Sequence, residues 1–501
     1  MKVLSASQMR EVDRLTIESG IPGLILMENA GSRVVDLLLK TFSPLREHNI
    51  VVICGKGNNG GDGFVVARQL FSRRLCQSVI AVELFDPETL TGDARENRRM
   101  LKASGCPIFR EISRELSFST LVIDAVLGTG LTGPARGPAL DAIHAINQRF
   151  PLARKVAVDI PSGLPSEETN PIGAYVAADY TVTFTAPKRS QCLSPTYEAM
   201  GQLTVVPIGT PPAFCETNPI YKLEMTTRSE IRHLFAERSK NSNKGMYGHV
   251  LVIGGSFGKS GAPAMSGFAA LRSGAGLVTV AVPEAALPNV AAVRPELMTV
   301  RLENDLSETL DKKTVVALGP GLGTEEPAVR LVKTLYQDEN IPFVVDADAL
   351  NALAGSLPKT DKIRVLTPHP GEMSRLTGKS VKEIQGSRVG AAESLARESG
   401  ATVVLKGDRT IIAFPDGETW VNPTGSPAMA TGGTGDILTG MIAGLIGQHP
   451  SDWKHAVIAA VWLHGRSGEL AAKRWGEQAM LATDLLDALP GAMDELRNPL
   501  R

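Results

Sequence analysis

The sequence lacks the features that would assign it to a nucleic-acid-binding, membrane or secreted class. It has almost no excess charge, because 52 lysines and arginines face 53 aspartates and glutamates, for a formal net charge of -1. This balance argues against a general nucleic-acid or membrane-surface role. The N-terminus carries Lys2, Arg10, Glu11 and Asp13 without a long apolar run. We therefore expect no signal peptide, no membrane anchor and no nucleic-acid or membrane partner.

Cysteine is scarce, with five widely spaced residues in a chain of 501. An odd number at such spacing matches neither a disulfide framework nor a zinc motif, and it fits a reducing, cytoplasmic compartment. Glycine, in contrast, is plentiful at 49 residues and is clustered after apolar runs. That distribution is typical of α/β proteins with ligand-binding turns at strand ends. The length exceeds what one core supports and predicts two or three domains.

The first half alternates short β-branched runs with helical segments. We expect strands at residues 50–54, 78–84, 121–127, 155–159, 181–185 and 202–206, and helices at 5–18, 24–40, 64–70, 91–103 and 139–148. Ser5 with Gln8 three residues later forms a capping box for the first helix. Strands that alternate with helices predict an open α/β sheet.

The strand at 50–54 runs into G-K-G-N-N-G-G-D-G, residues 55–63, and then into a helix. This is the layout of a nucleotide-binding crossover, and the G-x-G-x-x-G spacing survives. Asn58, Asn59 and Asp62, however, crowd the turn with side-chain oxygens. We therefore favour a site for polar hydroxyls, phosphate or a hard cation, which prefers oxygen ligands. The alternative is a turn rich in Asn, Gly and Asp only because these residues tolerate left-handed geometry.

Polar residues also follow other strands of the first half. Asp124, Asp159 and Ser162 come at or just past strand ends, and that edge of an open α/β sheet is where ligands bind. Asn59, Asp124 and Ser162 could converge there as oxygen ligands for one cation. Each of them alone is more readily explained as a turn residue. Lys188 follows the strand at 181–185 and could contact a ligand anion or be a solvated surface lysine.

Residues 207–219 carry several prolines and little periodicity, so we interpret them as a linker. A second α/β series follows, with strands at 248–253, 277–282, 315–318, 343–345, 364–366 and 402–405. The segment G-G-S-F-G-K-S-G-A-P at 254–263 lacks the spacing of a P-loop. Four strands of this half end in G-P-G-L-G, D-A-D-A-L-N, T-P-H-P-G-E-M and K-G-D-R-T. Turns of this kind along one sheet edge predict a pocket.

The stretch A-T-G-G-T-G-D-I-L, residues 430–438, leads into an apolar helix expected at 437–446. Its glycines let the backbone turn sharply, and the free amides of a helix start bind anionic oxygens. A phosphate would repel Asp436, so we interpret Asp436 as the group that holds or deprotonates a reacting hydroxyl. Alternatively, Asp436 only caps the helix. His369, between two prolines, either positions a ligand or is an ordinary surface histidine.

Taken together, the motifs resemble a known family. L-M-E-N-A-G, G-x-G-N-N-G-G-D-G, G-T-G-L-x-G and D-I-P-S-G-L resemble the NAD(P)H-hydrate epimerase domain. G-P-G-L-G, D-A-D-A-L, T-P-H-P-G-E-M, the K-G string and G-G-T-G-D resemble the ADP/ATP-dependent NAD(P)H-hydrate dehydratase domain of the ribokinase-like superfamily. The whole chain thus resembles the bifunctional NAD(P)H-hydrate repair enzymes. This implies an α/β protein with an N-terminal Rossmann-like three-layer domain, residues 1–215, and a C-terminal ribokinase-like α/β domain, residues 226–501.

For the first domain the resemblance implies an isomerase that interconverts the R and S hydrates, NADHX or NADPHX. The residues implied to line this substrate are Asn58, Asn59, Gly60, Gly61, Asp62, Gly128, Thr129, Gly130, Leu131, Thr132, Gly133, Pro134 and Asp159. It further implies that Asn59, Asp124 and Ser162 bind K⁺. Asp159 is the residue we expect to transfer protons at the hydrated carbon.

For the second domain the resemblance implies a lyase that dehydrates the S hydrate at the expense of ADP, with Mg²⁺. Contacts to the hydrate are implied for Ala262, Gly323, His369 and Asp436. The residues implied to bind the nucleotide are Lys406, Gly407, Asp408, Arg409, Thr410 and Gly435. We choose ADP over ATP because bacterial members of the family typically use ADP, and here the two domains are fused and no targeting segment is present.

Chemically, Asp436 would accept the proton of the hydrate's hydroxyl while the nucleotide phosphorylates it, and the glycine amides would stabilise the transferred charge. The resemblance also implies a homo-oligomer. Two rival readings are a small-molecule kinase of the same superfamily, which would leave the first half unexplained, and a non-catalytic nucleotide sensor.

Overall fold

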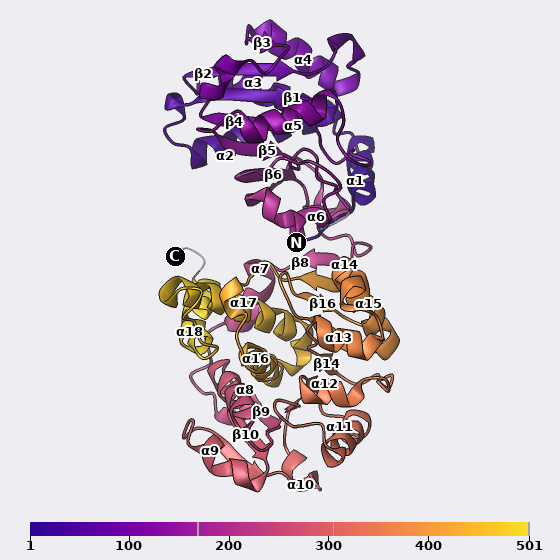
Figure 1. The fold of residues 1–501 in the computed structure, drawn as a ribbon, viewed down its shortest axis with the longest axis vertical. Helices are drawn as coiled ribbons and strands as arrows, with labels where there is room; N and C mark the ends of the chain where they lie inside the picture. The colour runs from indigo at the N-terminus through magenta and orange to yellow at the C-terminus, as the bar shows by residue number, and fades with distance from the viewer. Residues whose placement is uncertain (168–169, 304, 499–501) are drawn as a thin grey trace. The chain divides into compact units, whose positions relative to one another are not determined.

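The computed structural model describes residues 1–167, 170–303 and 305–498. The chain forms two compact units, Met1–Tyr221 and Lys222–Arg501, each of which is a sheet covered by helices (Figure 1). The proline-rich segment that we interpreted as a linker lies within the first unit, where Ile208 and Cys215 are buried. Among the described residues, no helix is long and apolar enough to cross a lipid bilayer.

The sheet of the first unit has seven strands in the order β3-β2-β1-β4-β5-β6-β7, and all neighbours are parallel. Its strands are β1 (Asn49–Cys54), β2 (Ser78–Glu83), β3 (Ile108–Phe109), β4 (Leu121–Ala125), β5 (Arg154–Val158), β6 (Tyr180–Phe184) and β7 (Gln202–Val206). Its helices are α1 (Ala6–Glu18), α2 (Gly23–Thr41), α3 (Asn58–Ser72), α4 (Gly92–Ser104), α5 (Pro138–Gln148) and α6 (Arg189–Cys192). The strand order reverses between β1 and β4, so the carboxyl ends of these strands border the crevice where such sheets bind ligands.

The first unit has three layers because the side chains of β1 alternate between two cores. Val52 packs with residues of α2 and α3 on one face, and Val51 and Ile53 pack with residues of α5 on the other. All three side chains are fully buried, and burial of each contributes about 1.5–3 kcal/mol. This arrangement confirms the predicted Rossmann-like class. The predicted capping box of Ser5 and Gln8 is also present at the start of α1.

The sheet of the second unit has ten strands in the order β11-β10-β9-β12-β13-β14-β15-β16-β17-β8. It is parallel from β11 to β15 and antiparallel at β15, β16 and β17, and β8 pairs parallel with β17. The strands are β8 (Leu223–Met225), β9 (His249–Ile253), β10 (Leu277–Val282), β11 (Met298–Arg301), β12 (Val315–Leu318), β13 (Phe343–Val345), β14 (Arg364–Leu366), β15 (Thr402–Leu405), β16 (Ile411–Ala413) and β17 (Thr419–Val421).

Helices cover both faces of this second sheet. They are α7 (Arg228–Ile231), α8 (Gly261–Arg272), α9 (Leu287–Ala291), α10 (Ser307–Leu310), α11 (Glu326–Asp338), α12 (Asp348–Leu353), α13 (Pro370–Thr377), α14 (Val381–Gly386), α15 (Arg388–Ser399), α16 (Thr434–Gln448), α17 (Trp453–Trp475) and α18 (Asp484–Arg497). One core joins α8, α16, α17 and α18 to the sheet, and another joins α11 and α12 to its opposite face.

Helix α16 lies in the middle of the first of these cores. It begins at Thr434, three residues before the predicted start at residue 437, and it is buried from Ile437 to Gly447. A Cβ on Gly440 would lie 2.0 Å from the carbonyl oxygen of Ser266 in α8, so glycine permits the two helices to touch. Ser266 Oγ also donates a hydrogen bond to the carbonyl of Asp436 at 2.8 Å. The apolar helix thereby holds Asp436 at a defined place.

Candidate active sites

A cavity of about 1020 Å³ opens at the carboxyl edge of the first sheet. The predicted substrate residues that line it are Asn58, Asn59, Asp62, Gly128, Thr129, Gly130, Leu131, Thr132 and Asp159. Those that are not among its lining residues are Gly60, Gly61, Gly133 and Pro134. A volume of this size is at the upper end of the range for small-molecule pockets. Two loops and one helix start thus face the same space, as expected for a sheet-edge site.

The stretch rich in Asn and Gly is the first part of a helix, whereas we expected a turn with the helix starting at residue 64. Helix α3 begins at Asn58 with Gly57 as its N-cap. A Cβ on Gly60 would lie 1.8 Å from the carbonyl oxygen of Gly55, so the helix start packs directly on the end of β1. A Cβ on Gly61 would lie 2.5 Å from Met27 Sδ. These glycines allow close packing, which brings the polar residues of the same turn to the cavity.

Asp159 and Lys188 form an ion pair in the cavity wall. Asp159 follows β5 with a φ of +65°, a conformation that costs a non-glycine residue about 1–3 kcal/mol. Lys188 Nζ lies 2.6 Å from Asp159 Oδ1, and Thr183 Oγ1 donates to the same oxygen at 3.0 Å. Gln191 Nε2 donates to the Asp159 carbonyl at 2.6 Å. The Lys188 side chain is 2% exposed, so it is not the solvated surface lysine of our alternative interpretation.

Two further carboxyl groups in the cavity wall interact electrostatically with this ion pair. Asp13, on α1, is one of them. Burial raises the pKa of Asp13 to about 6, against the opposing charge of Lys188 and with a smaller contribution from the charge of Asp159. Burial, followed by the charges of Asp159 and Asp13, raises the pKa of Asp62 well above its usual range. Three carboxyl groups therefore share one buried ammonium, and two of them keep a proton where an ordinary aspartate is ionised.

The three residues predicted to bind a cation lie around Leu127, where Asn59 lines the cavity and Asp124 and Ser162 are buried beneath its wall. Ser162 Oγ donates to Asp124 Oδ1 at 2.5 Å, and the Ser162 amide donates to Oδ2 at 2.8 Å. Asn59 Nδ2 donates to the Leu127 carbonyl at 3.0 Å. Burial raises the pKa of Asp124 to about 6, although the hydrogen bonds from Ser162 oppose this.

Asn59 Oδ1 supplies a test of whether this group suits a cation. It is buried and has no hydrogen-bond partner among the described residues, a state that is unfavourable unless an ion or a water satisfies it. A carboxylate, a hydroxyl and a backbone carbonyl lie in the same cluster. Such oxygen donors suit a hard cation. The residues therefore fit the K⁺ that the resemblance implies.

The second unit has its own charged centre, at the ends of β13 and β15. Lys406 Nζ lies 2.7 Å from Asp346 Oδ1 and 3.7 Å from Glu372 Oε2. Thr439 Oγ1, from α16, donates to Asp346 Oδ2 at 2.7 Å. Burial alone would lower the pKa of Lys406, but the carboxylates of Asp346 and Glu372 outweigh it and raise the pKa. Lys406 is therefore positively charged at neutral pH and is held in place by the two carboxylates.

Asp436 lies in the first turn of α16, next to this centre. Gly433, with a φ of +98°, is the N-cap of α16, so the alternative in which Asp436 is the cap is wrong. Burial and, to a smaller extent, the charge of Asp346 raise the pKa of Asp436 to about 6, against the opposing charge of Lys406. A Cβ on Gly435 would lie 3.4 Å from Lys406 Nζ. The carboxyl group of Asp436 is thus poised to exchange a proton near neutral pH.

His369 is the N-cap of α13 and lies partly outside this centre. Its Nδ1 accepts a hydrogen bond from the amide of Gly371 at 3.0 Å. Its Nε2 lies 3.6 Å from Glu372 Oε1, and the side chain is 51% exposed. His369 is therefore connected to Lys406 through Glu372 and keeps half of its ring surface for other contacts.

Gly323 and Ala262 are connected to Asp436 through other residues, Gly323 through Asp348 and Ala262 through Ser266. The Gly323 amide donates to Asp348 Oδ2 at 2.8 Å, and the charge of Asp348 raises the pKa of Asp436. Ala262 lies in the first turn of α8. Ser266 Oγ contacts the carbonyls of both Ala262 and Asp436, at 3.2 and 2.8 Å.

The loop from Lys406 to Thr410 joins β15 to β16 and contains Gly407, Asp408 and Arg409. Arg388 Nη2, from α15, donates to the carbonyls of Leu405 and Lys406 at 3.1 and 3.3 Å. Gly407 has a φ of +139°, and a Cβ there would lie 2.8 Å from Arg388 Nη1. This loop is thus held by an arginine that sequence reasoning did not single out.

Acids outnumber lysines in this second centre. Asp346, Asp348 and Glu372 all raise the pKa of Asp436, and the nearby lysines are Lys406 and Lys259, whose Nζ is 3.4 Å from Asp348 Oδ2. A surplus of carboxylate oxygens suits a hard divalent cation. The residues therefore fit Mg²⁺ brought in with a nucleotide.

Several of these groups escaped the prediction from sequence. Asp346 and Glu372 stand inside the motifs D-A-D-A-L and T-P-H-P-G-E-M, so their position after strands was an available signal. No signal in the sequence indicated that Asp13 or Arg388 belongs to a site, because each lies on an amphipathic helix, where a charged residue is ordinary.

Fold and sites together define a two-part α/β enzyme with a separate candidate site at the edge of each sheet. Two family models match the chain. One, described as YjeF-related protein N-terminus, matches residues 23–190, and the other, described as NAD(P)H-hydrate dehydratase, matches residues 250–491.

Relatives match over nearly the whole chain. The bifunctional NAD(P)H-hydrate repair enzyme of Moorella thermoacetica is 41% identical, and the match covers 99% of this chain and 97% of that protein. The enzyme of the same name from Coxiella burnetii is 40% identical over 96% of this chain and 97% of its own length. That of Escherichia coli K12 is 37% identical over 93% and 88%. The chain belongs to the family of bifunctional NAD(P)H-hydrate repair enzymes.

Solved structures resemble the second half. The ADP/ATP-dependent NAD(P)H-hydrate dehydratase of Bacillus subtilis, co-crystallised with ATP and Mg²⁺, is 38% identical with a TM-score of 0.51, and the match covers 55% of this chain and 98% of that one. A ribokinase-like superfamily protein of Enterococcus faecalis is 31% identical with a TM-score of 0.50, over 55% and 96%. The predicted family and the ribokinase-like class of the second domain are confirmed.

Proposed function

We propose that residues 1–215 epimerise the R and S forms of NADHX and NADPHX, and that residues 226–501 dehydrate the S form with ADP as the phosphoryl donor. One observation carries the proposal. Each unit places a carboxyl group beside a largely buried lysine at the carboxyl edge of its own sheet, Asp159 with Lys188 and Asp436 next to Lys406. Two proton-transfer sites in one chain suit two reactions on one damaged cofactor.

In the first reaction, a protonated carboxyl group gives its proton to the hydroxyl at the hydrated carbon. The C–O bond breaks, water leaves, and the lone pair of the ring nitrogen forms a C=N bond. Water then adds to the other face and gives one proton to a carboxylate. Asp13, whose pKa burial raises to about 6, suits the donor role, and Asp159, paired with Lys188, suits the acceptor role.

The residues that line the cavity would make the other contacts to the substrate of the first site. Asn58, Asn59, Asp62 and the residues from Gly128 to Thr132 face the substrate, whereas Gly60, Gly61, Gly133 and Pro134 shape the backbone that carries these contacts. Asn59, Asp124 and Ser162 would hold K⁺. By holding that ion, these residues would keep the loop around Leu127 in place, since the Leu127 carbonyl already accepts a hydrogen bond from Asn59.

In the second reaction, Asp436 accepts the proton of the hydrate's hydroxyl as its oxygen bonds to the terminal phosphorus of ADP, and AMP leaves. The phosphate ester then eliminates. The C–O bond breaks with loss of phosphate, and the neighbouring carbon gives a proton to the departing phosphate as its C–H electron pair restores the C=C bond of the dihydronicotinamide. The amides at the start of α16 and the cation of Lys406 stabilise the transferred phosphoryl group.

The nucleotide would lie against Gly435 and the loop containing Lys406, Gly407, Asp408, Arg409 and Thr410. The hydrate would contact Ala262, Gly323, His369 and Asp436. Mg²⁺, which the crystallised Bacillus subtilis relative was given together with ATP, would neutralise phosphate charge. Asp346 and Glu372 are the carboxylates that would hold it.

The choice of ADP is tested by incubating the full chain with hydrated NADH and either nucleotide, side by side. Recovery of dihydronicotinamide absorbance with ADP and little with ATP supports the choice, and the reverse preference overturns it. Recovery with neither nucleotide counts against repair and favours a kinase for another hydroxyl. Nucleotide binding without any turnover would indicate a sensor.

We assign the protein to the cytoplasm, because all five cysteines are free thiols, which suits a reducing compartment. A homo-oligomer remains a prediction from the family, to be tested by light scattering of the purified chain.

A further inference from the structure

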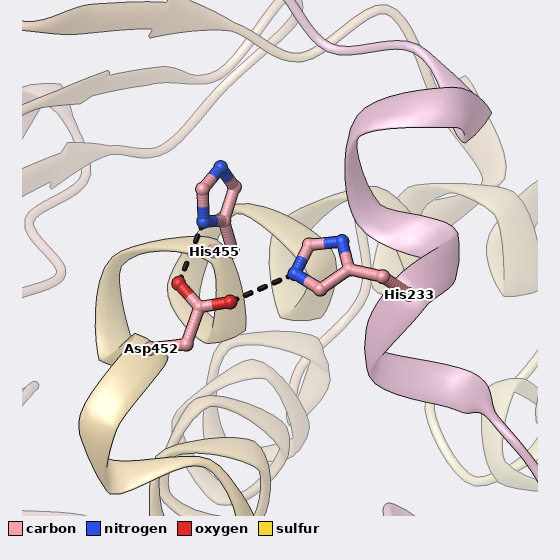
Figure 2. A group of neighbouring side chains, drawn as sticks. All are labelled: His233, Asp452 and His455. Carbon is pink, nitrogen blue, oxygen red and sulfur yellow. Dashed lines mark hydrogen bonds and ion pairs between the residues drawn. The ribbon is translucent and has the colours of Figure 1, made fainter.

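Away from both sites, the second unit contains a group of two histidines and one aspartate (Figure 2). His233 lies in the short helix η6 (Arg232–Phe235), Asp452 ends the short helix η10 (Pro450–Asp452), and His455 lies in the first turn of α17. Figure 2 shows both rings turned toward the carboxylate between them. The group therefore joins the beginning of the second unit to one of its longest helices.

The distances bring three donor atoms to one place. His233 Nε2 lies 2.8 Å from Asp452 Oδ2, and His455 Nδ1 lies 2.7 Å from Asp452 Oδ1. The two ring centroids are 5.2 Å apart, with the rings nearly perpendicular. One donor atom from each residue lies within 4.8 Å of the other two. Bonds of about 2.0–2.1 Å in a tetrahedral site require donor atoms about 3.3 Å apart, so small side-chain rotations suffice.

The charge of the group favours a cation. Burial alone would raise the pKa of Asp452, but the hydrogen bonds from His233 and His455 outweigh it and lower the pKa. The carboxylate is therefore ionised at neutral pH. The positive end of the α17 dipole opposes a cation at this position, and the carboxylate offsets it. All three side chains are between 37% and 50% exposed, so an ion can enter from water.

We propose that His233, Asp452 and His455 bind one divalent transition-metal ion of the Zn²⁺ class, with water completing the shell. Two imidazoles and one carboxylate suit Zn²⁺, Ni²⁺ or Cu²⁺ and disfavour Mg²⁺, which prefers oxygen ligands. On binding, the proton on each ligating nitrogen moves to the other nitrogen of the same ring, so neutral rings release no net proton. The ion would fasten η6 to α17 and stabilise the folded second unit by mass action.

The test uses the full chain without a histidine tag, stripped of metal with a chelator. Zn²⁺ is titrated calorimetrically, with Mg²⁺ as the hard-ion comparison. Ni²⁺ binding is followed by quenching of tryptophan fluorescence, because the Trp420 ring lies 6.5 Å from that of His455 and Trp453 starts α17. We expect one Zn²⁺ per chain, quenching by Ni²⁺, and a higher melting temperature with Zn²⁺.

Variants locate the ion. His233→Ala and His455→Ala should each weaken Zn²⁺ binding by at least about tenfold and abolish the rise in melting temperature, whereas His144→Ala, which removes an exposed histidine of the first unit, should change neither. Asp452→Asn keeps the shape and removes the charge, and it should weaken Zn²⁺ binding too. Unchanged dehydration by the metal-free variants shows that they are folded. Zn²⁺ binding that survives in both histidine variants, or no binding by the parent chain, overturns the proposal.

Discussion

Lys188→Met removes the cation at the centre of the first site and keeps most of the apolar part of the side chain. In the folded protein the Lys188 ammonium lies 2.6 Å from Asp159 Oδ1 and lowers the pKa of both Asp13 and Asp62. Without it, three carboxyl groups face one another in the cavity wall. Breaking a buried ion pair from one side costs about 3–5 kcal/mol. The Asp159 side chain is 15% exposed to the cavity, so we expect the lower end, about 3 kcal/mol.

A loss of that size is measurable in a unit of this length. For domains of roughly 150–250 residues, each kcal/mol shifts the melting temperature by about 2–4 °C, so we expect a fall of about 6–12 °C for the first unit. All four tryptophans, Trp420, Trp453, Trp462 and Trp475, lie in the second unit. Tryptophan fluorescence therefore reports only the second unit, and limited proteolysis with calorimetry must follow the first.

The double variant Lys188→Met with Asp159→Asn separates charge from packing. Removing both partners replaces an unpaired carboxylate by a neutral amide, so most of the lost stability should return, while epimerisation stays absent. Dehydration of the S hydrate should be unchanged in both variants. If Lys188→Met alone left the first unit as stable as the parent chain, the claim that Lys188 balances these carboxyl groups would be refuted.

Three further outcomes follow from the sites. Because burial raises the pKa of Asp13 to about 6, its protonated form is lost as pH rises through that value. The rate of epimerisation, corrected for the uncatalysed rate, should fall about tenfold per pH unit above this pKa. Asp13→Asn should epimerise about 10²–10⁴-fold more slowly, and its rate should no longer show this fall with pH. Asp436→Ala should lower the dehydration rate by about 10²–10⁴-fold while calorimetry still detects nucleotide binding. K⁺ should raise the melting temperature of the first unit more than choline at equal ionic strength, and in Asn59→Leu this difference should vanish.

Much of the fold was readable from local patterns. Short β-branched runs such as residues 50–54 are buried on both faces of a parallel sheet, so the strands were visible as apolar runs. The predicted first residues of helices agreed less well with the structure than the predicted strands did. Asn58 and Thr434 begin α3 and α16, although glycine next to them lowers helix propensity. Close packing overrides this low helix propensity. Gly60 packs on Gly55 and Gly440 packs on Ser266. The second contact joins residues that are far apart in the sequence.

In the sites, too, some features could be predicted from local sequence patterns and others depended on tertiary packing. Residues that follow strands, such as Asp159 and Asp124, could be assigned to a sheet edge because parallel strands end together. Which side chains pair across that edge could not be read, since it depends on segments that are far apart in the chain. The interaction of Lys188 with Asp159 and the approach of Asp13 from the first helix are both of this kind. For the same reason, burial of Lys188 could not be told from exposure.

The division of labour between the two units is tested most directly with the purified R hydrate of NADH and ADP. The parent chain should restore dihydronicotinamide absorbance in full, because the first unit supplies the S form that the second unit consumes. Asp159→Ala should restore it only at the rate of uncatalysed epimerisation, and adding Asp436→Ala chain to it should rescue the fast rate. Fast recovery by Asp159→Ala alone, or no rescue by the mixture, would contradict the assignment of one reaction to each unit.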